Sequence, residues 1–573
     1  MTHWIADSLS KEIKSFWLDI ACIGGDHEIK GTGSKLERYA PHSLACWVEE
    51  PHESIEFDRK PSHRCSMFLL SLLRRLHLAR SACCCWYPHN PLGDSHLTIA
   101  ELGWLNLGWL VLDLAIVIVL IPTILLQRRE SGATLAWIMV ILLVPFLGLL
   151  AFWLFGTTRL HLRRRRRRRI ESRLAPELQR LQTQPVSKSI PEEIPHSLLH
   201  LAENLDGMGP QPGNRVVLLR HGASVFDALE SALDQARHHV HLVYYIWEPD
   251  ATGVRMRDAL VRAAARGVQV RLLLDDVGSR RARHSFFSPL TLQGGSVERF
   301  LPVNPLNRQL TLNNRNHRKI VVVDGLVGFT GGMNVGDIYA GLADSWLDLH
   351  ARLEGPVIQS LQETFCQDWY HATGEDLVNT DYFPQVADAG TVWAQLLTSG
   401  PADERWRAIH TFMFAAINLA QKQVWIETPY FVPDPPILMA LQTAALRGVD
   451  VRLLLPGRSD HPLVLHAGRS FFNELLAAGV RLFEVHHALP HAKTATIDGF
   501  FSTLGSANMD QRSFRLNFEA NVFLFAESAA RQLERDFLGL CSKAEEVTVK
   551  SRRQISRSRQ LTESLCRVMA PLL

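Results

Sequence analysis

One short stretch occurs twice in this chain, and its repetition constrains the fold more than any other feature. The first copy, residues 317–334, reads HRKIVVVDGLVGFTGGMN, and the second, residues 491–508, reads HAKTATIDGFFSTLGSAN. In each copy the apolar residues after the first His are typical of a buried strand. A strand projects alternate side chains to the same face, so we expect His317 to lie beside Lys319 and His491 beside Lys493.

Each copy combines an imidazole, an ammonium group and a turn of small residues, which together suit a phosphoryl group. Imidazole can attack phosphorus or donate a proton near neutral pH, and ammonium groups neutralise charge on phosphate oxygens. Glycines allow backbone N–H groups to approach an anion, and an Asn amide adds a donor. A single His near a Lys is usually a solvated strand end, but two copies with matched spacing favour chemistry. The pattern nominates these residues for phosphate binding: Gly331, Gly332, Asn334, Gly505, Ser506 and Asn508.

These stretches resemble the paired HxKxxxxD motifs of the phospholipase D superfamily. The order of the chain from about residue 100 to residue 573, with apolar segments ahead of two such halves, is similar to that of bacterial cardiolipin synthases. The catalytic residues that this resemblance implies are His317, Lys319, Asp324, His491, Lys493 and Asp498. It also implies that the two His flank one phosphate, one as nucleophile and the other as acid and then base. No metal or cofactor is expected, because the lysines can supply the positive charge.

The two motifs belong to a longer internal duplication. RGVQVRLLL (266–274) and RGVDVRLLL (447–455) are offset by 181 residues (447 − 266), and the His motifs by 174 (491 − 317). Similar offsets indicate duplicated domains. The periodicity predicts helices at 224–237, 254–266, 405–421 and 436–447, and strands at 241–247, 268–275, 424–428 and 449–455. We therefore predict an α/β protein of two phospholipase D-like α-β-α halves, residues 209–388 and 389–573, preceded by a two-helix transmembrane hairpin.

Each catalytic His needs an acidic partner that fixes its tautomer. Asp348 follows the first motif, and Glu519 follows the second within the family's Asn-x-Glu pattern. Asp324 and Asp498, although they belong to the motifs, fall at the far ends of the predicted strands, where a structural pairing with a basic or backbone group is expected. Ser506 replaces the Gly332 of the first motif, which predicts a hydroxyl contact to phosphate on one side only.

The segment 99–157 carries two long apolar runs. Residues 104–126 and 134–155 each exceed 20 residues, which is enough for a helix to cross a bilayer. Seven consecutive arginines, 163–169, follow within a basic linker, 158–208. Because positive residues stay on the cytoplasmic side, both chain ends are predicted to be cytoplasmic. The expected location is therefore the bacterial inner membrane, with a multi-pass chain and its catalytic domain facing the cytoplasm.

The two ends of the chain give weaker predictions. Residues 1–98 hold six of the nine Cys, without the paired spacing of a zinc site, and read as a poorly ordered extension or as residues upstream of the natural start. Residues 560–573 are amphipathic, and they could lie on a bilayer or pack on the core.

The predicted reaction is phosphatidyl transfer between two phosphatidylglycerol molecules, giving cardiolipin and glycerol through a phosphohistidine. The alternatives are a membrane-tethered phosphodiesterase, hydrolase or nuclease of the same superfamily, and a non-catalytic scaffold, which the two intact motifs disfavour. The expected partners are anionic phospholipids and the membrane. Nucleic acid is not expected, because the arginine run has no interleaved aromatic residues. The sequence fixes neither the oligomeric state nor which His is the nucleophile.

Overall fold

The computed structural model describes residues 99–126, 131–152, 191–206, 208–302, 314–342, 346–401, 407–568 and 570 of the 573-residue chain. The predicted extension 1–98 and the arginine run 163–169 lie outside the described residues. The described residues from 103 onward belong to one compact unit, which contains both motifs.

The apolar segment forms helices α3 (Ile99–Leu126), α4 (Ser131–Leu143) and α5 (Pro145–Ala151). The second run is broken at Val144, because Pro145 has no N–H to continue the helical hydrogen bonds. Ile124 of α3 and Ile141 of α4 are buried in one cluster, so the two runs pack against each other. Among the residues that the structure describes, no helix combines the length and sustained hydropathy that a bilayer-crossing segment requires. The transmembrane nature of this hairpin therefore stays a prediction.

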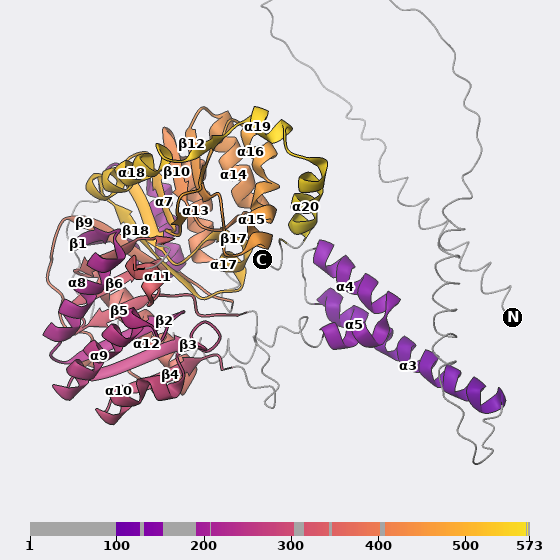
Figure 1. Cartoon of the computed structure of the whole chain (residues 1–573), viewed down its shortest axis with the longest axis horizontal. Coiled ribbons are helices and arrows are strands. Elements are labelled where there is room, and N and C mark those ends of the chain that lie inside the picture. Colours follow the sequence, from indigo (N-terminus) through magenta and orange to yellow (C-terminus); the bar gives the residue numbers. More distant parts are fainter. Residues whose placement is uncertain are drawn as a thin grey trace, which may run out of the picture. The chain divides into compact units, whose positions relative to one another are not determined.

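A single mixed sheet of 15 strands runs through both halves (Figure 1). From its centre the order is β1-β8-β6-β5-β2-β3-β4 on one side and β9-β18-β16-β15-β10-β12-β13-β19 on the other. The strands of the first side are β1 (Gln211–Leu219), β2 (His239–Tyr244), β3 (Gln269–Asp275), β4 (Ser296–Phe300), β5 (Ile320–Val323), β6 (Val327–Gly331) and β8 (His350–Glu354). Those of the second are β9 (Val392–Ser399), β10 (Gln423–Glu427), β12 (Asp450–Pro456), β13 (Arg481–Val485), β15 (Thr494–Ile497), β16 (Phe501–Gly505), β18 (Glu519–Phe525) and β19 (Glu545–Val547).

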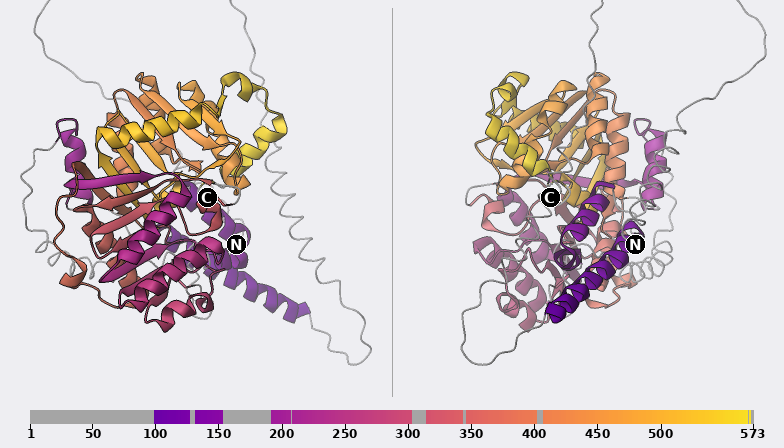
Figure 2. Two further views of the ribbon diagram at one scale, coloured as in Figure 1. Left: turned by 60° about the vertical axis from the view of Figure 1, so that its left-hand side comes forward. Right: turned by 90° about the vertical axis from the view of Figure 1, so that its right-hand side faces the viewer.

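The two sides repeat the same pairing, which confirms the predicted duplication. β5 lies antiparallel between β2 and β6, and β15 lies antiparallel between β10 and β16. β2 and β10 are each parallel to the next strand outward. The sides meet where β1 pairs antiparallel with β9. Figure 2 shows the earlier half in magenta to red beside the later half in orange to yellow. The four predicted strands are confirmed, whereas the predicted half boundaries remain a prediction.

Helices cover both faces of the sheet. The helices of the first half are α8 (Gly222–Gln235), α9 (Ala251–Ala265), α10 (Ser288–Leu292), α11 (Asp337–Ala340) and α12 (Val357–Thr373), with 3-10 turns η4 (His284–Phe287) and η5 (Thr380–Tyr382). Those of the second half are α13 (Ala408–Leu419), α14 (Pro435–Leu446), α15 (Pro462–Arg469), α16 (Phe472–Ala477), α17 (Gln511–Arg515), α18 (Glu527–Cys541), α19 (Val549–Arg553) and α20 (Arg557–Val568). Helix α7 (His196–Asp206), in the predicted linker, packs into the core of the second half.

Alternation along the central strands explains this layering. Val240 and Leu242 of β2 pack with α8 and α9, whereas His241, on the other face, stacks on Phe365 of α12. In β10, Val424 packs with α13 and α14. The neighbouring Trp425 stacks on Phe537 of α18. The two halves therefore share one α-β-α arrangement, as the sequence predicts.

Short strands lie beside the motifs. β7 (Trp346–Leu347) of the first half pairs parallel with β14 (Leu489–Pro490) of the second, whereas β11 (Phe431–Val432) and β17 (Met509–Asp510) pair within the second half. A single bridge joins Asn316 to Phe518. Asp348, which follows β7, thus lies next to His491, and Glu519, which follows Phe518, lies next to His317.

Candidate active site

His317 precedes β5 and is held by the second half of the chain. Its backbone N–H donates to the carbonyl of Phe518 at 2.9 Å. Its Nδ1 lies 3.0 and 3.1 Å from the two carboxylate oxygens of Glu519, and 3.0 Å from the carbonyl oxygen of Ser506. The carboxylate of Glu519 is fully buried.

His491 precedes β15 and is held in the same way by the first half. Its backbone N–H donates to the carbonyl of Leu347 at 2.7 Å, and its Nδ1 lies 2.6 Å from a carboxylate oxygen of Asp348. The carboxylate of Asp348 is also fully buried. Each His thus takes its acidic partner from the opposite half, so the two His–carboxylate pairs are crossed.

The crossed pairs fix the tautomer of both imidazoles. A carboxylate at Nδ1 retains the proton there, so the lone pair of a neutral ring lies on Nε2. Nε2 of His317 or His491 is therefore the atom available to attack phosphorus or to exchange a proton with an alcohol. Asp348 and Glu519, nominated as orienting residues, have the geometry for that role.

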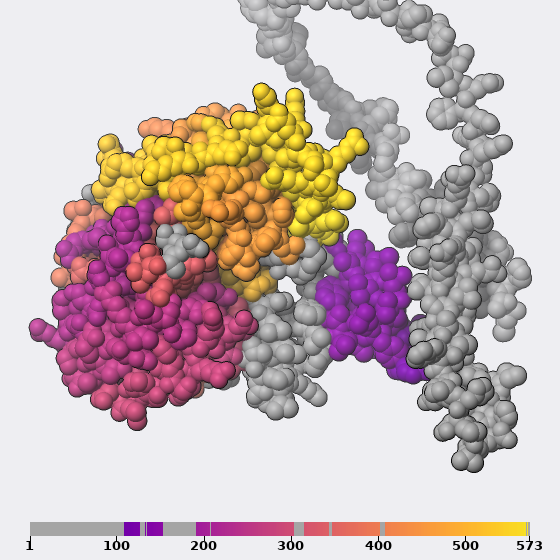
Figure 3. All heavy atoms as spheres, in the orientation of Figure 1, coloured from indigo at the N-terminus to yellow at the C-terminus, as the bar shows by residue number. Residues whose placement is uncertain are grey.

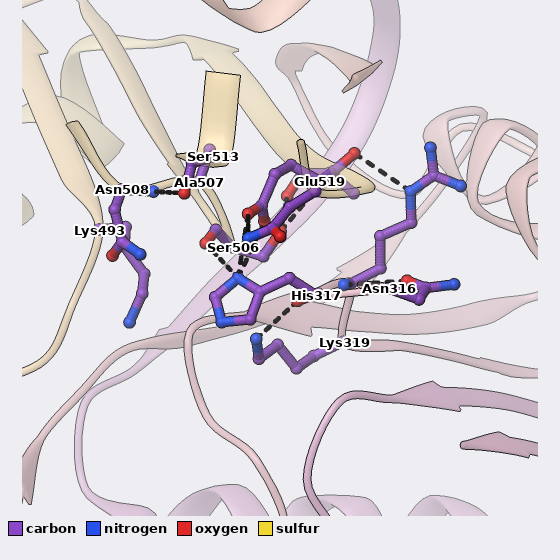
Figure 4. A network of polar contacts seen from close by, with 12 residues as sticks. Asn316, His317, Lys319, Lys493, Ser506, Ala507, Asn508, Ser513 and Glu519 are labelled. Carbon is purple, nitrogen blue, oxygen red and sulfur yellow. Dashed lines mark hydrogen bonds and ion pairs between the residues drawn. The ribbon is translucent and has the colours of Figure 1, made fainter. Parts of the chain in front are cut away.

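Each lysine contacts the His of its own motif and also acts electrostatically on the His of the other half. Nζ of Lys319 donates to the carbonyl of His317 at 2.6 Å, and Nζ of Lys493 lies 2.9 Å from Nδ1 of His491. Burial is the main cause that lowers the pKa of both imidazoles, and the lysine of the other half adds to it, Lys493 for His317 and Lys319 for His491. The two imidazoles and two lysines therefore share one electrostatic environment. Figure 4 shows His317 with Lys319 and Lys493, which come from different halves, in one group of side chains.

Burial makes these cations costly without a ligand. Burial lowers the pKa of Lys319 to about 7 and that of His491 to about 4, and it also lowers the pKa of Lys493. For Asp348 burial would raise the pKa, but Lys493 and His491 outweigh it and hold that pKa below its ordinary value. An anionic phosphate would favour the charged lysines and so restore their pKa values upward.

The small residues of the motifs serve the carboxylates and the sheet. A Cβ at Gly332 would lie 2.1 Å from a carboxylate oxygen of Asp348, so only Gly fits there. At the matching position the hydroxyl of Ser506 donates to Glu519, so it supports the carboxylate where a phosphate contact was expected. A Cβ at Gly331 would lie 2.5 Å from the carbonyl oxygen of Leu349, which makes that Gly a requirement of strand packing.

Gly505 has the same structural role in the second half, where a Cβ would lie 2.4 Å from the carbonyl oxygen of Ala520. The two motif Asn residues differ from each other. Asn334 accepts from the N–H of Ile246 at 3.1 Å and donates to the Tyr339 hydroxyl at 2.8 Å. The side-chain oxygen of Asn508 is buried without a hydrogen-bond partner in the described structure.

Asp324 and Asp498 do not join the other motif residues at the site. They follow β5 and β15, at the ends opposite to the His, and both have a left-handed backbone with φ of 55°. Asp324 accepts hydrogen bonds from the backbone N–H groups of residues 237–239, and Asp498 from those of residues 421–423. Their place among the catalytic candidates is therefore corrected: they fix the turns that begin β2 and β10, in line with the expected structural pairing.

Aromatic side chains surround the imidazoles, and the sequence analysis did not identify them. The ring of Trp346 lies 4.5 Å from that of His491, and the ring of Tyr430 lies 6.3 Å away. The ring of Tyr245 lies 4.9 Å from that of His317, and Nζ of Lys319 lies 5.5 Å from it. Tyr245 directly follows β2, inside the predicted strand 241–247, and Tyr430 follows β10 and the predicted strand 424–428. Their place at the carboxyl ends of matching strands is the signal that could have found them.

Similarity to known proteins agrees with this geometry. A family profile described as cardiolipin synthase, PLD-like domain, matches residues 229–369 and 413–541, and a phospholipase D-nuclease N-terminal profile matches residues 111–156. The cardiolipin synthase of Geobacillus thermodenitrificans is 38% identical over 455 residues, which cover 78% of this chain and 90% of that protein. The chain belongs to the cardiolipin synthase family.

Other cardiolipin synthases show the same extent of similarity. Cardiolipin synthase 2 of Bacillus anthracis is 38% identical over 459 residues, covering 78% of this chain and 88% of that protein. Among solved structures, the phosphatidylserine synthase of Haemophilus influenzae has a similar fold, with a TM-score of 0.52 and 13% identity over 65% of this chain and 99% of that one. The prediction of a phosphatidyltransferase of the phospholipase D superfamily is confirmed.

Proposed function

We propose that this member of the family transfers a phosphatidyl group from one phosphatidylglycerol to the headgroup hydroxyl of a second, giving cardiolipin and glycerol. The observation that carries the proposal is the pair of crossed His–carboxylate contacts, His317–Glu519 and His491–Asp348. Two oriented imidazoles in one cationic site provide an entering group and a leaving-group acid for displacement at phosphorus.

In the first step, Nε2 of one neutral imidazole attacks phosphorus and the P–O bond to the headgroup glycerol breaks. The second imidazole, protonated, gives its proton to that departing oxygen. The phosphatidyl group remains on the first His as a phosphohistidine. Lys319 and Lys493 offset the charge on the phosphate oxygens, and the amide of Asn508, whose buried oxygen has no hydrogen-bond partner among the described residues, is a further polar group of the second motif.

In the second step, the now neutral second imidazole removes the proton from a hydroxyl of the incoming phosphatidylglycerol. The oxygen attacks phosphorus, the P–N bond breaks, and the first His is released. Water in place of this hydroxyl would give phosphatidic acid. The half-buried ring of Trp346, 4.5 Å from that of His491, excludes water from one side of this imidazole, which favours the lipid hydroxyl over water.

We also propose that the two apolar runs, 104–126 and 134–155, anchor the chain in the inner membrane with the catalytic domain on the cytoplasmic side. Their helices expose large apolar side chains: Ile118 is 62% exposed and Leu135 is also 62% exposed. Such surfaces favour lipid over water. Alkaline phosphatase, which is active only outside the cytoplasm, should be active when inserted at 127–130 and inactive when fused to the C-terminus; activity at the C-terminus would contradict this topology.

The reaction is tested by supplying phosphatidylglycerol, labelled in its headgroup glycerol, to membranes containing the protein. The wild type should release labelled glycerol and form cardiolipin in equal amounts, and His317→Ala and His491→Ala should do neither. His200→Ala, which alters an exposed His of α7, is the matched control. Phosphatidic acid as the main lipid product would replace the synthase proposal by a hydrolase.

A further inference from the structure

The last long helix, α20, has two different faces. On one face, Glu563 and Cys566 are buried against the rest of the second half. On the other, the side chains of Leu561, Leu565 and Val568 are 61%, 61% and 76% exposed. The three exposed positions are spaced by four and three residues, so they form one stripe along the helix. A stripe of large apolar side chains on a surface helix marks an interaction site.

The charges around this stripe are positive. Between residues 549 and 568 the only carboxylate is that of Glu563, which is 2% exposed and pairs with Arg552. Lys550, Arg553 and Arg557 in the same segment are exposed. An apolar stripe bordered by cations complements an anionic lipid surface, because apolar side chains enter the headgroup region and cations meet the phosphates.

Helix α20 lies on the His491 side of the molecule. Helix α20 packs against α15, and the turn before α15 carries Asp460, which accepts a hydrogen bond from the Tyr430 hydroxyl at 2.9 Å. The Tyr430 ring is one of those beside His491. Figure 3 shows the C-terminal segment in yellow on the surface of the second half.

We propose that α20 is an interfacial helix that inserts Leu561, Leu565 and Val568 into the surface of an anionic bilayer and so holds the His491 side of the site at the level of lipid headgroups. The two readings of residues 560–573 are then both true of one helix: one face packs on the core and the other meets lipid. The inference rests on the proposed function for the nature of its lipid partner.

Photocrosslinking tests the contact directly. The full-length protein, reconstituted in vesicles of phosphatidylglycerol and phosphatidylcholine, carries a benzophenone amino acid at position 565 or, as the matched control, at position 560 on another side of α20. Position 565 should crosslink to lipid and position 560 at least about fivefold less. A crosslink from position 565 to a second copy of the chain, or equal lipid labelling at both positions, would overturn the proposal.

A kinetic test separates this inference from the proposed function. The double variant Leu561→Ser, Leu565→Ser should raise the apparent KM for phosphatidylglycerol in vesicles by about fivefold or more, and leave activity in detergent micelles within about twofold. Leu292→Ser, which alters a leucine that is 84% exposed on α10, should change neither. A double variant equal to wild type in vesicles would refute the interfacial helix. If the wild type formed no cardiolipin in either assay, the proposed function would be refuted instead. The crosslinking experiment would then still test whether α20 contacts lipid, because it does not depend on activity.

Discussion

Three side chains contact the carboxylate of Glu519, which lies beside Nδ1 of His317 and accepts from the Ser506 hydroxyl and the Asn517 amide. Burial would raise the pKa of this carboxyl, but His317 outweighs burial and holds it below its ordinary value. The carboxylate of Asp348 contacts Nδ1 of His491 and accepts from the backbone N–H of Leu349. Individual residues thus make the two sides of the site chemically unequal.

We expect Glu519→Gln and Asp348→Asn to lower kcat by roughly a hundredfold to ten-thousandfold, because an amide no longer holds the proton on Nδ1. KM should change little, since neither carboxylate faces the lipid. Asp227→Asn, at an exposed surface pair, is the control for a generic loss of charge. A kcat within threefold of wild type for both site variants would contradict the tautomer argument.

We expect Gly332→Ala to be far more damaging than Ser506→Gly. The added Cβ at position 332 would displace Asp348, whereas the loss of the Ser506 hydroxyl removes one hydrogen bond to Glu519 and should cost about tenfold in kcat. Steady-state rates, with a thermal melt to verify folding, check the order. Equal activity of the two variants would show that Asp348 accommodates the Cβ.

At the scale of elements, β5 and β15 carry different functions at their two ends. The amino end presents His and Lys to the site, and the carboxyl end is followed by an Asp that binds backbone N–H groups of a neighbouring turn. Sequence periodicity found these strands, because alternating burial is a local property. It did not find that Ser506 serves Glu519, since that contact depends on β18 lying beside β16.

Asp498→Ala should reduce stability without altering chemistry. Three backbone N–H groups lose their acceptor, and Ala fits poorly at a φ of 55°, so the free energy of unfolding should fall by roughly 2–4 kcal/mol. Turnover per folded molecule should stay within about twofold of wild type. Thermal melts and active-site titration measure the two quantities; a folded variant with no activity would return Asp498 to the catalytic group.

At the scale of the whole molecule, the sequence predicted the duplication. It did not predict that each half supplies the acidic partner for the His of the other. The offset of the motifs established two similar halves, because each motif is local. The exchange of Asp348 and Glu519 between them follows from β7 pairing with β14 and Asn316 bridging to Phe518, which are contacts between distant segments. Aromatic residues beside the imidazoles were missed for the same reason.

Buried neutral His side chains should make the fold acid-sensitive. Burial lowers the pKa of His239 and of His350 to about 4, and that of His241 well below its ordinary value. Because the folded pKa values lie below the unfolded value, the unfolded chain binds more protons between about pH 6.5 and pH 4. The stability that these groups contribute is present above that range and is lost as the pH falls through it.

The melting temperature of the wild type should therefore fall as the pH is lowered from about 6.5 to about 4. The melting temperature of His239→Leu should fall less steeply over the same range. His461→Leu, at a side chain that is 62% exposed, is the matched control and should follow the wild-type curve. Parallel curves for all three proteins would assign the acid sensitivity to other groups.

The exchange of carboxylates between halves also bears on ancestry. A polypeptide with a single motif would hold an imidazole without its acid, so it would have to associate with a copy of itself before any turnover. Joining two copies in one gene removes that dependence on concentration and frees each copy to mutate separately. Positions 332 and 506 are equivalent in the two motifs, but the first is Gly and the second is Ser. A strictly symmetric homodimer cannot acquire such a difference, because both of its copies have the same sequence.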